Sequence, residues 1–243
     1  MFLTGGASGR LKLWRSDRGT PLYSTDGGPS GLLGCGVLSA IKLDAQDAQQ
    51  FLLTLVEGRL VQVAVHCSEA SGIAIDVEHE IVGDLGEVTD AAFLPHGGGA
   101  DGAPMLAVAT NSETVRVHNT ASASLGVAAA LAGHMEIVLC LSVDEDGGSG
   151  GKSTRPPAVF VAAGAKDGRV LLWRQWRRGG GKWQCVASAE GHVSAVAAVA
   201  LNVQHRVMLT GAADRTLKSW ALPDALFEDR GEAAGGGRIK VAR

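Results

Sequence analysis

The sequence predicts an all-β protein built from repeated four-stranded sheets, and three observations carry this prediction. An aspartate stands six residues before a tryptophan twice, in AKDGRVLLW (Asp167, Trp173) and in GAADRTLKSW (Asp214, Trp220). Short, nearly continuous apolar runs surround both motifs, as expected for strands that are covered on both faces. No long segment has a convincing helical period, and LPDALFEDRGEAA (222–234) comes nearest.

The composition is typical of a folded globular protein, with 46% hydrophobic and 19% charged residues among 243. A net charge of −3 gives no overall attraction to nucleic acid or anionic membranes, so any RNA contact must come from a local patch. We expect a soluble, intracellular protein, because the N-terminus lacks a signal-peptide pattern and no apolar run is long enough to span a membrane. The cysteines form no C-x-x-C pair, which argues against a zinc or redox motif; they are Cys35, Cys67, Cys140 and Cys185.

Aligning the chain on the Asp–Trp spacing gives five related segments, which recur roughly every 50 residues. They end at Trp14, Val63, His118, Trp173 and Trp220. In the fourth segment we expect strands at 137–143, 158–164, 169–173 and 183–189, and in the fifth at 195–201, 206–212 and 216–220. Glycine-rich inserts at 95–104 and 144–157 lengthen the third and fourth segments.

A Gly-His pair precedes the first expected strand of the last two segments, at His134 and His192. This pattern resembles the WD40 repeat, in which that histidine, a hydroxyl, the turn aspartate and the tryptophan satisfy one another's hydrogen bonds when buried. The fifth segment has the whole set, and the fourth has Ala163 in place of the hydroxyl. We expect this blade network to be structural; its members are His134, Asp167, Trp173, His192, Thr210, Asp214 and Trp220. The other segments are degenerate, with Ser8 and Trp14, Glu57 and Val63, and Ser112 and His118 at the Asp and Trp positions.

The order of the segments also resembles the transducin beta-like WD40 family of the small-subunit processome. The resemblance covers roughly residues 50–223 and is carried by GEVTDAAFLP, MLAVATNSETVRVHN and AGHMEIVLCLSVD in succession. It implies a non-enzymatic scaffold of the UtpB subcomplex, within the nucleolar assembly that matures pre-18S ribosomal RNA. The implied partners are other WD40 proteins of that assembly, with direct or indirect contact to pre-rRNA or small nucleolar RNA, and the implied location is the nucleus and nucleolus.

The same resemblance implies an incomplete WD40 β-propeller of about four and a half blades, spanning parts of two tandem propellers. We assign residues 1–82 to the last blades of a first propeller and residues 83–227 to the first blades of a second. Residues 228–243 are expected to form a low-complexity, disordered tail. The family's helical domain has no counterpart here, and we interpret the chain as a fragment.

One stretch, WRQWRRGGGKWQ (173–184), combines cations with aromatic residues on an expected loop. Such a patch can hold phosphates and stack on unpaired bases, or it can meet an acidic protein surface. A solvated hairpin loop is the alternative. The candidate contact residues are Arg174, Trp176, Arg177, Arg178, Lys182 and Trp183.

We predict no enzyme activity, cofactor or metal, because no set of convergent titratable residues can be assembled from the sequence. Gly151, Lys152 and Ser153 match the end of a phosphate-binding loop, but the first glycine and the following helix are missing. The alternative function is another WD40 interaction module, such as the substrate-recognition propeller of a ubiquitin ligase.

Overall fold

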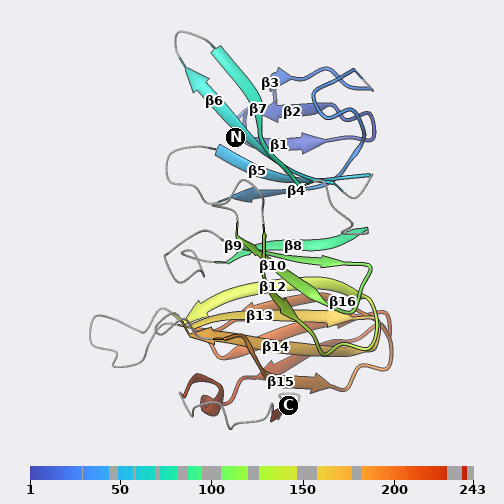
Figure 1. Ribbon diagram of the computed structural model, residues 1–243, viewed down its shortest axis with the longest axis vertical. Helices are drawn as coiled ribbons and strands as arrows, with labels where there is room; N and C mark the ends of the chain where they lie inside the picture. The colour runs from blue at the N-terminus through green and yellow to red at the C-terminus, as the bar shows by residue number, and fades with distance from the viewer. Residues whose placement is uncertain are drawn as a thin grey trace, which may run out of the picture. The chain divides into compact units, whose positions relative to one another are not determined.

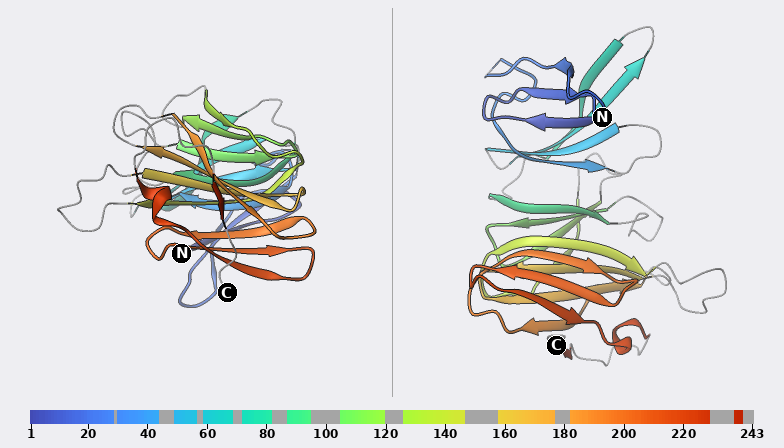
Figure 2. Two further views of the ribbon diagram at one scale, coloured as in Figure 1. Left: turned by 90° about the horizontal axis from the view of Figure 1, so that it is seen from below. Right: turned by 180° about the vertical axis from the view of Figure 1, so that it is seen from behind.

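A computed structural model describes most of the chain. It covers residues 1–28, 30–43, 49–56, 59–68, 72–81, 87–94, 105–119, 126–146, 158–176, 182–228 and 237–239. Internal contacts divide the chain into two compact units, Met1–Glu87 and Val88–Arg243. Both units consist of sheets whose consecutive strands pair antiparallel (Figures 1 and 2), which confirms the predicted all-β class and its propeller-type sheets.

The first unit contains a three-stranded and a four-stranded sheet. The strands of the first are β1 (Phe2–Gly5), β2 (Leu11–Trp14) and β3 (Pro21–Ser24). The strands of the second are β4 (Val37–Leu43), β5 (Gln49–Leu55), β6 (Leu60–Ser68) and β7 (Gly72–Ile81). Leu11 and Leu13 of the first sheet share one apolar core with Leu53 and Val63 of the second, so the two sheets pack face to face.

The second unit contains three sheets. The first has β8 (Val88–Leu94), β9 (Met105–Thr110), β10 (Val115–Asn119) and β11 (Val127–Leu131). The second has β12 (Val138–Asp146), β13 (Ala158–Ala165), β14 (Arg169–Trp176) and β15 (Gln184–Glu190). The third has β16 (Val196–Asn202), β17 (Val207–Ala212) and β18 (Leu217–Ala221).

Both faces of the β12–β15 sheet are buried, as the continuous apolar runs predicted. Val159, Val161 and Trp173 pack toward the β8–β11 sheet. Phe160, Ala162 and Leu172 pack toward the β16–β18 sheet, which Figure 2 shows lying against it in orange. Burial on both sides explains why polar and apolar residues do not alternate along these strands.

A valine begins the first strand of four sheets, and the strand pairing shifts by one residue directly after it. These valines are Val37, Val88, Val138 and Val196. Two of them project onto glycines of the preceding sheet, Val37 onto Gly5 and Val196 onto Gly164. The close approach of a β-branched side chain leaves no room for a Cβ at these glycines.

The edge strands β8, β12 and β16 of the second unit are linked by side chains, because an edge strand leaves backbone N–H groups unpaired. Asp90 on β8 accepts a hydrogen bond from Leu141 N of the next sheet at 2.7 Å. Asp144 on β12 accepts one from Val203 N, again at 2.7 Å, and Ser142 Oγ accepts one from Leu201 N at 3.0 Å. Burial raises the pKa of Asp90, and the hydrogen bonds from the backbone N–H groups oppose that shift.

After β18 the chain returns to the fourth expected segment. A short 3-10 helix, η1 (Asp224–Phe227), buries Phe227 against Phe160, with ring centroids 5.1 Å apart. Of the segment predicted to be a disordered tail, Gly237–Ile239 form strand β19, which pairs in parallel with β15. The other residues beyond 228 lie outside the described residues, as do the inserts at 95–104 and 147–157.

Gly164→Ala tests the packing of the sheets. A Cβ at Gly164 would lie 2.7 Å from Val196 Cγ1 and 2.8 Å from Cys140 Sγ. We expect a loss of about 1–3 kcal/mol in the free energy of unfolding, because the overpacked core must shift. The control is Gly211→Ala, the same change at the matching position of the β16–β18 sheet, where the nearest atom is Leu217 Cδ2 at 3.1 Å. This variant should be neutral or gain up to about 1 kcal/mol. Equal losses in denaturant titrations of the two variants would contradict the described packing.

Candidate functional site

The four predicted network residues of the last sheet meet in one hydrogen-bonded chain. Trp220 Nε1 donates to Thr210 Oγ1 at 2.8 Å, and Thr210 Oγ1 lies 2.8 Å from His192 Nε2. His192 Nδ1 lies 2.9 Å from Asp214 Oδ2. Because a carboxylate only accepts, Nδ1 carries the proton, and the hydroxyl of Thr210 donates to Nε2. A neutral imidazole therefore satisfies its contacts with both Asp214 and Thr210.

Asp214 accepts hydrogen bonds from other donors besides His192. Thr216 donates from its hydroxyl at 2.7 Å and from its backbone N–H at 2.9 Å, and Val193 N donates at 3.1 Å. The pKa of Asp214 lies below its usual range, first because of the Thr216 hydroxyl and then because of His192 and the backbone donors, which together outweigh desolvation. The turn that carries this residue is thereby fixed to the start of the last sheet.

The fourth segment has the same arrangement with one weaker contact. His134 Nδ1 lies 3.1 Å from Asp167 Oδ2, and the His134 ring meets Trp173 edge to face, as the His192 ring meets Trp220. In place of a hydroxyl, His134 Nε2 faces the carbonyl oxygen of Ala163 at 3.1 Å. Both neighbours are acceptors, so a neutral ring can donate to only one of them.

The pKa values of this pair follow from their surroundings. Burial lowers the pKa of His134, although Asp167 opposes the shift. Burial alone would raise the pKa of Asp167, but hydrogen bonds from Arg169 N, Met135 N and His134 outweigh it, and the pKa is lowered. At neutral pH the His134 ring therefore donates to Asp167 or to the carbonyl oxygen of Ala163, and the other contact lacks a proton. Both corresponding contacts of His192 have a donor and an acceptor.

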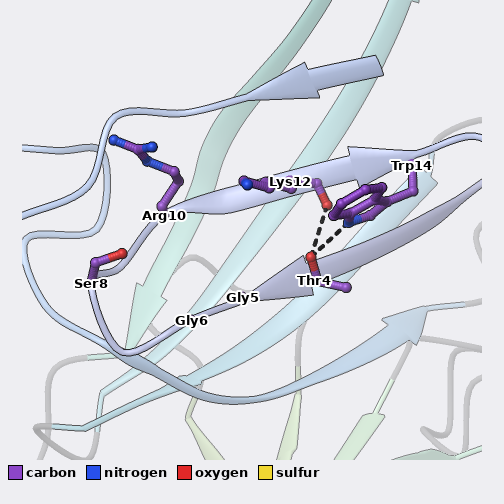
Figure 3. Close-up of a pocket in the computed structure, with 7 residues that line it drawn as sticks. All are labelled: Thr4, Gly5, Gly6, Ser8, Arg10, Lys12 and Trp14. Atoms are coloured by element: carbon purple, nitrogen blue, oxygen red, sulfur yellow. Dashed lines mark hydrogen bonds between the residues drawn. The ribbon is translucent and has the colours of Figure 1, made fainter. Parts of the chain in front are cut away.

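The degenerate segments keep parts of this geometry. Trp14 Nε1 donates to Thr4 Oγ1 at 2.8 Å (Figure 3), the distance found between Trp220 and Thr210. The Asp–Trp spacing pairs Trp14 with Ser8 and does not single out Thr4, although Thr4 precedes Trp14 by the same ten residues that separate Thr210 from Trp220. Ser112 Oγ accepts from Thr114 N at 3.4 Å, in the turn position that Asp214 takes toward Thr216.

In three of these turns the residue after the Asp position is left-handed. Gly9 and Gly168 have φ values of 74° and 77° there, and Arg215, which follows Asp214, has φ 63°. Glycine adopts this conformation without strain, whereas arginine does not. The hydrogen bonds to Asp214 therefore hold an unfavourable backbone conformation in place.

Among the described candidate contact residues, the structure brings Arg174 and Trp176 together and places Trp183 on the opposite face of the sheet. Arg174 is only 5% exposed; it donates to the carbonyl oxygens of Leu226 and Glu228 and lies over the ring of Trp176. Trp176 packs on the face toward β16–β18 and Trp183 on the face toward β8–β11. Lys182 is exposed. Arg177 and Arg178 lie outside the described residues. Arg174 therefore anchors η1 to β14 and is not available as a surface contact.

The Asp214–His192–Thr210 chain has the order of a catalytic triad, but its surroundings do not suit catalysis. Thr210 is 2% exposed and its oxygen already accepts from Trp220, so a substrate has no access to it.

Burial raises the pKa of the Cys140 thiol to about 12, and all four cysteines are free. Among the described residues, no group of three His, Cys, Asp or Glu side chains could hold a metal ion. Within the same residues, no helix is long and apolar enough to cross a membrane.

The fold and the His–Asp networks are similar to those of WD40 repeats. A family model, WD domain, G-beta repeat, matches residues 183–221, which run from just before β15 through β18. The fold and this match support a WD40 interaction module.

The chain is also similar to Transducin beta-like protein 3. It is 26% identical to the protein of Mus musculus over 230 residues, which cover 93% of this chain and 24% of the relative. It is 28% identical to the protein of Homo sapiens over 231 residues, with 93% and 24% covered. For Bos taurus the identity is 26% over 242 residues, with 98% and 26% covered. The chain thus spans about a quarter of the length of these curated relatives.

Thr210→Val tests the buried network. The substitution keeps the shape of the side chain but leaves the Trp220 N–H and His192 Nε2 without their partner inside the core. We expect a loss of about 2–4 kcal/mol in the free energy of unfolding. The control is Thr4→Val, which removes the same bond at the exposed Thr4 and should cost less than about 1 kcal/mol. A small effect at both positions would contradict a structural role for the network.

Stability should fall on acidification. Asp167 and Asp214 have folded pKa values below the unfolded value of about 4, so their contribution is present above that pH and is lost as the pH falls below it. The lowered pKa of His134 adds a loss that begins as the pH falls below about 6.5. Asp214→Asn should flatten the acid branch of the curve. Asp17→Asn, at an exposed turn carboxylate, is the control and should leave it unchanged. Denaturant titrations between about pH 7 and pH 3 measure both.

Proposed function

We propose that this protein is a non-enzymatic WD40 scaffold in the nucleolar assembly that matures pre-18S ribosomal RNA. The similarity to Transducin beta-like protein 3 carries the proposal, because it extends over 93–98% of this chain and thus includes the degenerate segments. A generic WD40 likeness would concentrate on the segments with the complete network. The order of degenerate and complete segments is what distinguishes one WD40 protein from another.

The chemistry of the site supports a binding role over a catalytic one. Each polar side chain that resembles a catalytic group is engaged within its own sheet or with the next one, as Thr210 and Asp214 are. The groups thereby hold turns and sheets in place. Binding is left to side chains on the rims of the sheets and in the loops that connect their strands.

The partners that we propose are other WD40 proteins of the small-subunit processome, with pre-rRNA or small nucleolar RNA in direct or indirect contact. The candidate contact surface is the loop between β14 and β15. Because Arg174 and Trp176 are engaged with η1 and the core, the contact should depend on Arg177, Arg178, Lys182 and the edge of Trp183.

The experiment is capture of partners by the tagged chain in cells of its own source. We expect the tagged protein in the nucleolus, together with WD40 proteins and precursors of the small-subunit RNA. Arg177→Ala with Arg178→Ala should reduce the captured RNA and protein by more than about tenfold, since two charged contacts near the centre of an interface each contribute about 1 kcal/mol or more. Arg15→Ala with Arg18→Ala removes the same charge at a turn of the first sheet and is the control.

Two failures can be told apart. Equal capture by the double variant and wild type would overturn the loop as the contact surface but leave the assembly role standing. Absence of the nucleolar assembly from the wild-type capture, with a different set of partners recovered, would overturn the proposed function itself.

A further inference from the structure

The β12–β15 sheet has a fifth strand, which the other sheets of the described residues do not have. Strand β19 lies along β15, the outer strand of this sheet (Figure 1), and pairs parallel to it. The register places Gly237 opposite Ala187, Arg238 opposite Ser188 and Ile239 opposite Ala189. A segment of the chain itself thus shows that the edge of β15 accepts an extended strand.

The outer edge of β15 lacks the features that usually protect an edge strand from further pairing. Proteins commonly place charged residues or prolines on such edges. From Cys185 to Ala189 the strand has neither, and Ala187 and Ala189 are small side chains buried in the core. The outer strand β7, in contrast, is charged at every second position from Asp76 to Glu80. The backbone edge of β15 is therefore suited to pair with a further strand.

Strand β19 covers only part of this edge, since it has three residues and β15 has seven. A short connection brings it there. Arg174 donates to the carbonyl oxygen of Glu228 at 3.1 Å, and residues 229–236 join this anchored point to Gly237. Such a connection gives a tethered strand an effective concentration of millimolar order. A strand of another molecule that pairs with more of β15 gains additional backbone hydrogen bonds and can take its place.

The charge at the end of β15 indicates which strand fits. Ser188 donates to Glu190 Oε1 at 3.3 Å, so these two side chains lie on one face of the strand. In the register of β19, the second residue of a docked strand lies opposite Ser188, and the fourth residue would lie opposite Glu190. Basic residues at these two places complement the carboxylate. In its own sequence the chain has Arg238 and Lys240 there.

We propose that the outer edge of β15 is a docking site for an extended segment of another protein, which pairs parallel to β15 in place of β19. The segment has a small, a basic, an aliphatic and a second basic residue in succession, as Gly237 to Lys240 do. Backbone hydrogen bonds supply the affinity, and the side chains supply the specificity. The chain's own strand is then an internal competitor for the edge. The site does not depend on the assembly role proposed above.

Binding of a labelled peptide, GGGRIKVAR (residues 235–243), to the full chain tests the proposal. Arg238→Pro with Ile239→Pro releases β19, because one of two successive N–H groups in a strand faces its neighbour and proline has none. Fluorescence anisotropy should show that this released variant binds the peptide more than about tenfold more tightly than wild type, since the tethered competitor is gone. The matched control, Val241→Pro with Ala242→Pro, changes residues outside β19 and should bind like wild type.

A charge at Ser188 tests the register of the docked strand. In the released variant, Ser188→Lys should weaken binding of the peptide about two- to fivefold, because like charges on opposite residues repel. Ser188→Glu should strengthen binding by a similar factor. A peptide with glutamate in place of its arginine should reverse both effects, and this reversal shows that weaker binding is not a lost fold. Equal affinities for all these combinations would contradict the register.

Hydrogen exchange locates the bound peptide. Amide protons of β15 should lose protection in the released variant and regain it when the peptide binds. Protection of β11 instead, the uncharged outer strand of the preceding sheet, would overturn the proposal. A released variant that does not bind the peptide would overturn it as well. Self-association of the released variant without peptide, measured by sedimentation velocity, would assign the edge to a second copy of the chain and also contradict the proposal.

Discussion

The buried indole N–H of Trp220 sets the constraint on which the arrangement of the sheets depends. A tryptophan fills the space between two stacked sheets, but its N–H must find an acceptor away from water. Thr210 supplies that acceptor, and its own proton goes to His192. The histidine belongs to the turn before the sheet and the aspartate to the turn within it. One buried donor thus ties together two turns and two strands.

The same constraint explains which substitutions the chain tolerates. Ala163 replaces the hydroxyl beside Trp173, and a backbone carbonyl takes its place toward the histidine. Ser112 replaces the turn aspartate and still caps the backbone two residues on. What each substitute retains is a hydrogen-bonding partner at the right point of the turn. The apolar strands then pack in the same way, and the sheet survives the loss of its signature residues.

The sequence predicted the class of fold and the members of the networks because their signal is local. The spacing of Asp214 and Trp220 is fixed by one turn and one strand, so it can be seen in a single segment. The positions of Arg174, Trp176 and Trp183 could not be predicted in this way. They are close in sequence, but Trp176 and Trp183 lie on opposite faces of a sheet that is covered on both sides. The engagement of Arg174 becomes visible only where η1 returns to β14. The links from Asp90 and Asp144 were missed for the same reason, because their partners lie in the next sheet.

Hydrogen bonds within one sheet and packing against a neighbouring sheet have different consequences for a sheet face that no described residue covers. The bond between Trp14 and Thr4 forms within one sheet and persists in the first sheet, although no described residue covers it. The cover of the ring, in contrast, must come from a neighbouring sheet. A tryptophan that keeps its acceptor within the sheet but has no sheet packed against its ring therefore indicates which kind of sheet face can pack there. The identity of the residues on an open face, rather than its exposed area, is what specifies the surface that can close it.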